Sequence, residues 1–151
     1  MKKGSKQTQI KICGLTKPEQ AVSCVKMGAN LIGLNCWNGS SRYIIPEIIC
    51  EIVSELPESA RTVGVFVNES PDSINNVMKH TGMDLVQLHG DEAVETCEKL
   101  EFPWFKAFRV SDKFKMSLIN MVSGTNSIGK IIDLIVLGLL NISCNLTYPI
   151  T

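Results

Sequence analysis

The sequence predicts a parallel α/β fold, in which short apolar strands alternate with helices. Three observations support this prediction: a strand–helix unit repeats five times before a sixth strand, the strands are nearly continuous apolar runs, and turn or capping residues separate the elements. Parallel neighbours need crossover helices that cover the sheet. Two architectures fit this pattern, an open doubly wound sheet and part of an eight-stranded barrel.

The first unit begins with the strand Gln9–Cys13 (QIKIC) and continues into the helix Lys17–Met27. Thr16 precedes the helix as a candidate N-cap, and Glu19 is the candidate capping-box partner. Gly28 occupies the position that a C-cap glycine favours. The first helix therefore has expected signals at both ends.

The next two units follow the same order of strand and helix. Leu31–Asn35 (LIGLN) is the second strand, and the helix Pro46–Leu56 carries proline in its first turn, where proline is tolerated. Thr62–Val67 (TVGVFV) is the third strand. The helix Pro71–Thr81 follows, and Ser70 is its expected N-cap.

The fourth unit is the strand Leu85–Leu88, closed by Gly90, and the helix Glu92–Leu100, with Asp91 close to the cap. The remaining predicted elements are the strand Trp104–Phe108, the helix Asp112–Val122 and the strand Lys130–Ile135. Residues 137–151 carry almost no charge and show no strand–turn–helix rhythm. We therefore expect a partial barrel domain over residues 1–136 and a divergent apolar tail over 137–151.

Composition narrows the possible functions. Fifteen basic residues balance fifteen acidic ones, so no basic excess favours nucleic-acid binding. The longest apolar stretch, 131–142, contains Asp133 and falls short of the ~20 residues of a membrane span. The first residues are charged and too polar for a secretory signal, so we expect a cytoplasmic protein. The oligomeric state, monomer or homodimer, stays open.

Six cysteines are present, and none forms a Cys-x-x-Cys pair. We expect reduced thiols, because a disulfide framework belongs to exported proteins. His80 and His89 lack metal-ligand spacing with these thiols, so no metal site is expected. We interpret the three cysteines that fall within predicted helices, Cys24, Cys50 and Cys97, as packing residues.

Several polar residues fall at the carboxyl ends of the predicted strands, where parallel α/β proteins place their active groups. Cys13 ends the first strand, Arg42 lies in the loop after the second, His89 ends the fourth, and Asp133 lies in the sixth. Taken singly, each has an ordinary structural explanation, although a carboxylate in an apolar run needs a partner or a strand end. Together they suit proton transfer on a small anionic substrate.

Five motifs occur in order along the chain: KICGLT from Lys11, SRY from Ser41, VGVFVN from Val63, VQLHG from Val86 and KAF from Lys106. In this combination the chain resembles the phosphoribosylanthranilate isomerases of tryptophan biosynthesis. The resemblance implies a (βα)8 TIM barrel, of which this sequence supplies six strands, an incomplete barrel. It also implies an Amadori rearrangement of N-(5-phosphoribosyl)anthranilate, an aminoaldose, to the 1-deoxyribulose 5-phosphate, without a metal or organic cofactor.

The same resemblance implies the roles of individual residues. Cys13 would be the general base and Asp133 the general acid. Arg42 would hold the anthranilate carboxylate, which suits a guanidinium fork. His89 and Lys11 would contribute to substrate binding.

The sequence departs from the family after its sixth strand. The Gly-Gly-x-Gly-Lys loop, strands seven and eight, and their phosphate-binding glycines are missing, so an inactive truncated remnant is the alternative hypothesis. A third reading, a barrel enzyme such as indole-glycerol-phosphate synthase, would use Lys11 and Lys106. The sequence places no matching glutamates at the ends of the predicted strands.

Overall fold

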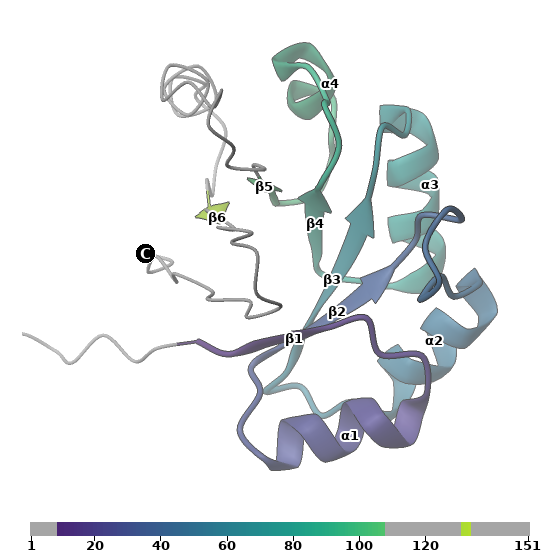
Figure 1. The fold of residues 1–151 in the computed structure, drawn as a ribbon, viewed down its shortest axis with the longest axis vertical. Coiled ribbons are helices and arrows are strands. Elements are labelled where there is room, and N and C mark those ends of the chain that lie inside the picture. The colour runs from purple at the N-terminus through teal and green to yellow at the C-terminus, as the bar shows by residue number, and fades with distance from the viewer. Residues whose placement is uncertain (1–8, 108–130, 134–151) are drawn as a thin grey trace, which may run out of the picture.

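The computed structural model describes residues 9–107 and 131–133 (Figure 1). Six parallel strands form one sheet in the order β1-β2-β3-β4-β5-β6, so each strand pairs with the next along the chain. The strands are β1 (Lys11–Cys13), β2 (Leu31–Asn35), β3 (Arg61–Phe66), β4 (Leu85–Leu88), β5 (Trp104–Ala107) and β6 (Ile131–Asp133). The helices are α1 (Pro18–Lys26), α2 (Pro46–Glu55), α3 (Pro71–Thr81) and α4 (Val94–Glu98).

The prediction of a parallel α/β fold is confirmed, and the strand order separates the two architectures. A doubly wound sheet reverses its strand order and places helices on both faces. Here the order runs straight through, and all four helices contribute to one apolar cluster on a single side of the sheet (Figure 1). This arrangement is the singly wound arc of a barrel, and six strands of it are described.

Side chains alternate between the two faces of each strand, and each face has its own core. The helix face buries the larger cluster, in which Ile32, Leu34 and Phe66 meet residues of all four helices. The opposite, inner face carries a smaller cluster of Val63, Leu85 and Phe105, with Leu31 packed against it. The inner face is the one that a barrel encloses.

The span and N-cap predicted for α3 and the C-cap glycine predicted for α1 are confirmed. Helix α3 covers the predicted span, and the Ser70 hydroxyl accepts a 3.2 Å hydrogen bond from the Ser73 amide. Gly82 ends this helix in the left-handed conformation, with φ +70°. Gly28 follows α1 with φ +104°, as the C-cap prediction requires.

The N-terminal caps predicted for α1 and α4 are wrong. Lys17 is the N-cap of α1, without a side-chain cap, and the amide of Thr16 donates instead to the side chain of Gln20. Helix α4 covers only Val94–Glu98 and starts after Ala93, so neither Asp91 nor Glu92 belongs to it. Glu92 is outside the helix because its carboxylate is engaged elsewhere, as described below.

The other strands and helices match their predicted ranges to within one or two residues. The predicted helix Asp112–Val122, the flanks of β6 and the tail 137–151 lie outside the described residues. Within 9–107 and 131–133, the structure contains no helix with the length and apolarity to cross a membrane.

Candidate functional site

Two predicted site residues, Lys11 and Cys13, share the inner face of β1. Their side chains converge over Gly33 of the neighbouring strand. A Cβ placed on Gly33 would lie 2.6 Å from Cys13 Sγ and 2.9 Å from Lys11 Nζ. The thiol and the ammonium group therefore occupy the space that any larger residue at position 33 would take. Cys13 is exposed, so its sulfur is accessible to a bound molecule.

Arg42 reaches the same place from the β2–α2 loop. Its side chain lies over Gly14, where a Cβ would stand 2.6 Å from Arg42 Cδ and 3.0 Å from Arg42 Nη1. Gly14 has φ +78°, a conformation that glycine adopts without a steric penalty. Gly14, the residue after Cys13, thus leaves room for the guanidinium group, and Arg42 lies beside the end of β1.

The β2–α2 loop holds Arg42 through the side chains of Asn35 and Ser40. Asn35 Nδ2 donates to Ser40 Oγ at 3.0 Å, and the Arg42 amide donates to the same hydroxyl at 3.1 Å. The Asn35 side-chain oxygen accepts from the Trp37 amide, and its carbonyl accepts from the Ile44 amide. These local hydrogen bonds fold the loop back on β2 and fix the position of the Arg42 backbone.

His89 follows β4, and Gln87 holds its imidazole. Gln87 Nε2 lies 2.9 Å from His89 Nδ1, and because an amide nitrogen only donates, Nδ1 is the acceptor in this arrangement. Gln87 shares the inner face of β4 with Leu85. Its Oε1 is buried and has no hydrogen-bond partner among the described residues. An oxygen in that position can accept a hydrogen bond from a bound molecule.

Asp133 is the last residue of β6, and its backbone pairs in register with Ala107 of β5. Cys13 is the last residue of β1. Because all six strands are parallel, both residues stand at the carboxyl edge of the sheet, on its first and last described strands. The structure therefore brings Cys13, Lys11 and Arg42 together and places Asp133 at the same edge by its backbone.

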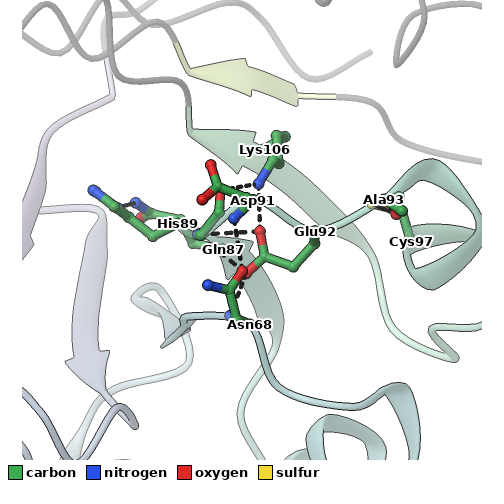
Figure 2. Close-up of polar contacts among 9 residues, drawn as sticks. Asn68, Gln87, His89, Asp91, Glu92, Ala93, Cys97 and Lys106 are labelled. Atoms are coloured by element: carbon green, nitrogen blue, oxygen red, sulfur yellow. Dashed lines mark hydrogen bonds and ion pairs between the residues drawn. The ribbon is translucent and has the colours of Figure 1, made fainter.

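A buried ion pair at this edge was not predicted from the sequence. Glu92, which follows β4, pairs with Lys106 of β5, and their side chains are 1% and 6% exposed (Figure 2). Lys106 shares the helix face of β5 with Trp104, so it does not point to the inner face. The reading as an indole-glycerol-phosphate synthase, which used Lys106 as a site residue, loses support. The missed signal was a lysine in an apolar strand, which needs a carboxylate partner.

The pKa values of three groups depart from their ordinary range. Burial raises the pKa of the Cys36 thiol to about 12 and also raises that of Cys97. Burial alone would raise the pKa of Glu92 as well, but hydrogen bonds from Lys106 and from backbone amides outweigh it and lower the pKa. Cys36 and Cys97 therefore stay protonated near neutral pH, which fits packing thiols rather than bases.

Metal ligation has no support in the described part of the chain. Among residues 9–107 and 131–133, no group of three or more His, Cys, Asp or Glu side chains could hold an ion. The functional groups at the end of β1 are the thiol of Cys13, the ammonium group of Lys11 and the guanidinium group of Arg42. Such a set can bind an anion and move a proton.

Comparison with known proteins identifies the family. A sequence model described as N-(5'phosphoribosyl)anthranilate (PRA) isomerase matches residues 10–134. The chain belongs to the phosphoribosylanthranilate isomerase family. The match extends over all six described strands and includes both Cys13 and Asp133.

Individual relatives agree with the family assignment. The N-(5'-phosphoribosyl)anthranilate isomerase of Trichlorobacter lovleyi is 44% identical over 102 residues, which cover 68% of this chain and 50% of the relative. The isomerase of Thermotoga neapolitana is 39% identical over 138 residues, covering 83% of this chain and 67% of the relative. The chain spans about half the length of most of the relatives that it matches.

Solved structures of the phosphoribosylanthranilate isomerase family share the fold. The enzyme from Thermotoga maritima superimposes with a TM-score of 0.75 at 36% identity, covering 84% of this chain and 62% of that one. A phosphoribosylanthranilate isomerase in complex with reduced 1-(o-carboxyphenylamino)-1-deoxyribulose 5-phosphate also gives a TM-score of 0.75 at 36% identity, with 65% of that chain covered. These similarities confirm that the sheet is part of a barrel of the isomerase type.

Proposed function

We propose that this protein catalyses the Amadori rearrangement of N-(5-phosphoribosyl)anthranilate to 1-(2-carboxyphenylamino)-1-deoxyribulose 5-phosphate, the third step of tryptophan synthesis from chorismate. The observation that carries the proposal is the convergence of Cys13, Lys11 and Arg42 at the end of β1. Family membership and the similarity to an isomerase structure that holds a reduced product analogue support the same reaction.

The reaction moves two protons and needs no outside reactant. A general acid protonates the ring oxygen of the aminoaldose, and the furanose opens to a Schiff base. A general base then removes the proton from the adjacent carbon, and its electron pair moves toward the iminium nitrogen. The resulting enol tautomerises to the ketone. One proton is added and one is removed, so the change is an isomerisation.

We assign the base to Cys13 and the acid to Asp133. The exposed sulfur of Cys13 is accessible, and the ammonium group of Lys11 lies beside it. Asp133 belongs to the same carboxyl edge through its place at the end of β6. A carboxyl at this edge suits protonation of a ring oxygen.

We assign substrate binding to Arg42, Lys11 and His89. The planar guanidinium of Arg42 fits a carboxylate such as that of anthranilate, because two parallel hydrogen bonds match its fork. Lys11 adds a second positive charge, beside the thiol of Cys13. Gln87 orients the imidazole of His89, and we assign this ring as a hydrogen-bonding group for the sugar.

Substitution of the two proton-transfer residues tests the proposal. Freshly prepared N-(5-phosphoribosyl)anthranilate is incubated with the chain, and product formation is measured by chromatography. Cys13→Ala and Asp133→Asn should each reduce kcat by about 10²- to 10⁴-fold, the usual contribution of a general acid or base. Cys50→Ala is the control, because that thiol lies on α2 and contacts the His80 carbonyl instead.

Two results would contradict this proposal. Full activity in both variants would remove the assigned roles. An inactive chain that folds cooperatively would favour the alternative, a non-catalytic remnant over residues 1–136 with an apolar tail at 137–151.

As part of the proposal, we place the protein in the cytoplasm, which agrees with the free thiols of Cys13, Cys24, Cys36, Cys50 and Cys97.

A further inference from the structure

The buried ion pair between Glu92 and Lys106 lies beside His89 but is separate from the groups assigned to proton transfer. Removing two charges from water costs several kcal/mol for each ion, and their attraction repays the cost only with further hydrogen bonds. The side chain of Glu92 is 1% exposed and that of Lys106 is 6% exposed. The hydrogen bonds that these two groups make therefore indicate what the pair does.

The additional hydrogen bonds of the pair go to the backbone around His89 (Figure 2). Glu92 Oε1 accepts from the Asn68 amide at 2.8 Å, and both carboxylate oxygens lie 3.1 Å from the Gly90 amide nitrogen. Lys106 Nζ donates to the Gly90 carbonyl. Both polar backbone groups of Gly90, the residue directly after His89, are held by this one pair.

Asn68 ties the same turn to the end of β3. Its side-chain Oδ1 accepts from the Asp91 amide at 2.7 Å, and its own backbone adopts φ +54°. A Cβ on Gly90 would lie 2.3 Å from this Oδ1, so the two segments are in close contact. The His89 amide also donates to the Phe66 carbonyl at 2.8 Å. Residues 89, 90 and 91 are thus each attached to neighbouring strands or turns.

We propose that Glu92 and Lys106 are positioning residues, which lock the β4–α4 turn and thereby fix where His89 presents its imidazole to the substrate. This inference rests on the proposed function only in treating His89 as a substrate-binding residue. The hydrogen-bond geometry supports it independently, because every bond of the pair beyond the ion pair itself ends on the backbone at Gly90 or Asn68.

The test compares Glu92→Gln with a matched pair on the surface. Glutamine keeps the length of the side chain and one oxygen acceptor but removes the charge and the second acceptor. We expect kcat/KM to fall by about 10- to 100-fold, the loss that a misplacement of about 1 Å produces. The exposed ion pair between Lys79 and Glu101 provides the control, and Glu101→Gln should leave kcat/KM unchanged.

A spectroscopic readout separates positioning from general stability. The chain has two histidines, and His80 is exposed on α3, away from the turn. In ¹H–¹⁵N spectra of the imidazole rings, Glu92→Gln should shift the His89 signals and leave those of His80 in place. A variant that folds with both rings and kcat/KM unchanged would overturn the inference.

Lys106→Met is the second variant if Glu92→Gln fails to fold. Methionine has a similar length without the charge, so the bonds from Lys106 to Glu92 and to the Gly90 carbonyl are lost. A shift of the His89 signals supports the lock, and unchanged signals contradict it. If the wild-type chain has no isomerase activity, the proposed function fails, but the ring spectra still decide this inference.

Discussion

Single residues set the geometry of the site. Two of them are glycines, which leave space for the side chains of their neighbours. Gly33 leaves the space in which Cys13 and Lys11 meet, and Gly14 leaves the space in which Arg42 lies. Gly14 also needs its positive φ, whereas Gly33 is required only for space. A glycine next to a catalytic motif can therefore be part of the binding site although it contributes no functional group.

Substitution of Gly14 by alanine should weaken substrate binding. The new Cβ would stand 2.6 Å from Arg42 Cδ and displace the guanidinium, so KM should rise about tenfold, as expected for one lost charge-assisted hydrogen bond. Gly82→Ala is the matched control, because Gly82 has φ +70° and its nearest neighbour would be 3.9 Å away. Both variants should lose about 1–2 kcal/mol of stability, because alanine is strained in the left-handed conformation, as measured by urea unfolding. An unchanged KM in Gly14→Ala would contradict the contact with Arg42.

The cysteines should differ in reactivity according to exposure and pKa. Cys13 is exposed, whereas burial raises the pKa of Cys36 to about 12. At pH 8 only about one Cys36 thiol in 10⁴ is a thiolate, and the thiolate is the reacting form. Iodoacetamide should therefore label Cys13 long before Cys36, as followed by peptide mass spectrometry, and raising the pH toward 12 should narrow the difference. Equal labelling rates in the folded chain at pH 8 would be inconsistent with this burial, and urea-unfolded chain provides the control.

At the scale of the element, the four helices do not all start in the same way. Helix α3 has a serine cap and a left-handed glycine at its end. Helix α1 starts with proline after Lys17, without a side-chain cap, although Thr16 stands nearby. Helix α4 starts late because Glu92 is bound to Lys106 rather than to the helix. The helix starts therefore depend partly on contacts made far along the chain.

Removal of the Ser70 hydroxyl should destabilise the protein measurably. Ser70→Ala leaves the Ser73 amide without its capping acceptor, and such a loss typically costs about 1 kcal/mol. Thr16→Ala should have almost no effect, because Thr16 makes no cap hydrogen bond to α1 through its side chain. Urea midpoints of the two variants provide the comparison. Equal losses would show that the assignment of the caps is wrong.

The elements with strong local signals were the ones predicted well. Ser70 and Pro71 mark the start of α3 without reference to the rest of the chain, and its predicted range is confirmed. The range predicted for α4 was too long, since Glu92 suits a helix start by propensity alone. Its buried partner lies on β5, 14 residues further on, and a local pattern contains no information about that contact.

At the scale of the whole molecule, the sheet separates two cores. Phe66 belongs to the helix-face cluster, and Phe105 belongs to the inner cluster with Val63 and Leu85. Each of the two phenylalanines is 2% exposed. The site residues of β1 share the inner face with the smaller cluster, so the packing of that cluster supports the site.

Truncation of either phenylalanine should be costly. Phe66→Ala and Phe105→Ala should each lower the free energy of unfolding by about 3–5 kcal/mol, because both leave a cavity in a packed cluster. Urea unfolding followed by circular dichroism measures both losses. A loss below about 1 kcal/mol for Phe105→Ala alone would mean that the inner face is open to water in solution.

The sequence by itself determined the parallel α/β class, the ranges of the six described strands and four described helices to within a few residues, and the family, because apolar periodicity, caps and ordered motifs are local properties of the chain. The tertiary structure decided which architecture the pattern builds, through the unbroken order of the strands and the helices on one side. It also decided which groups meet: Arg42 over Gly14, Lys11 and Cys13 over Gly33, and Glu92 with Lys106. These contacts join residues that are distant in sequence, so only the fold could bring them together.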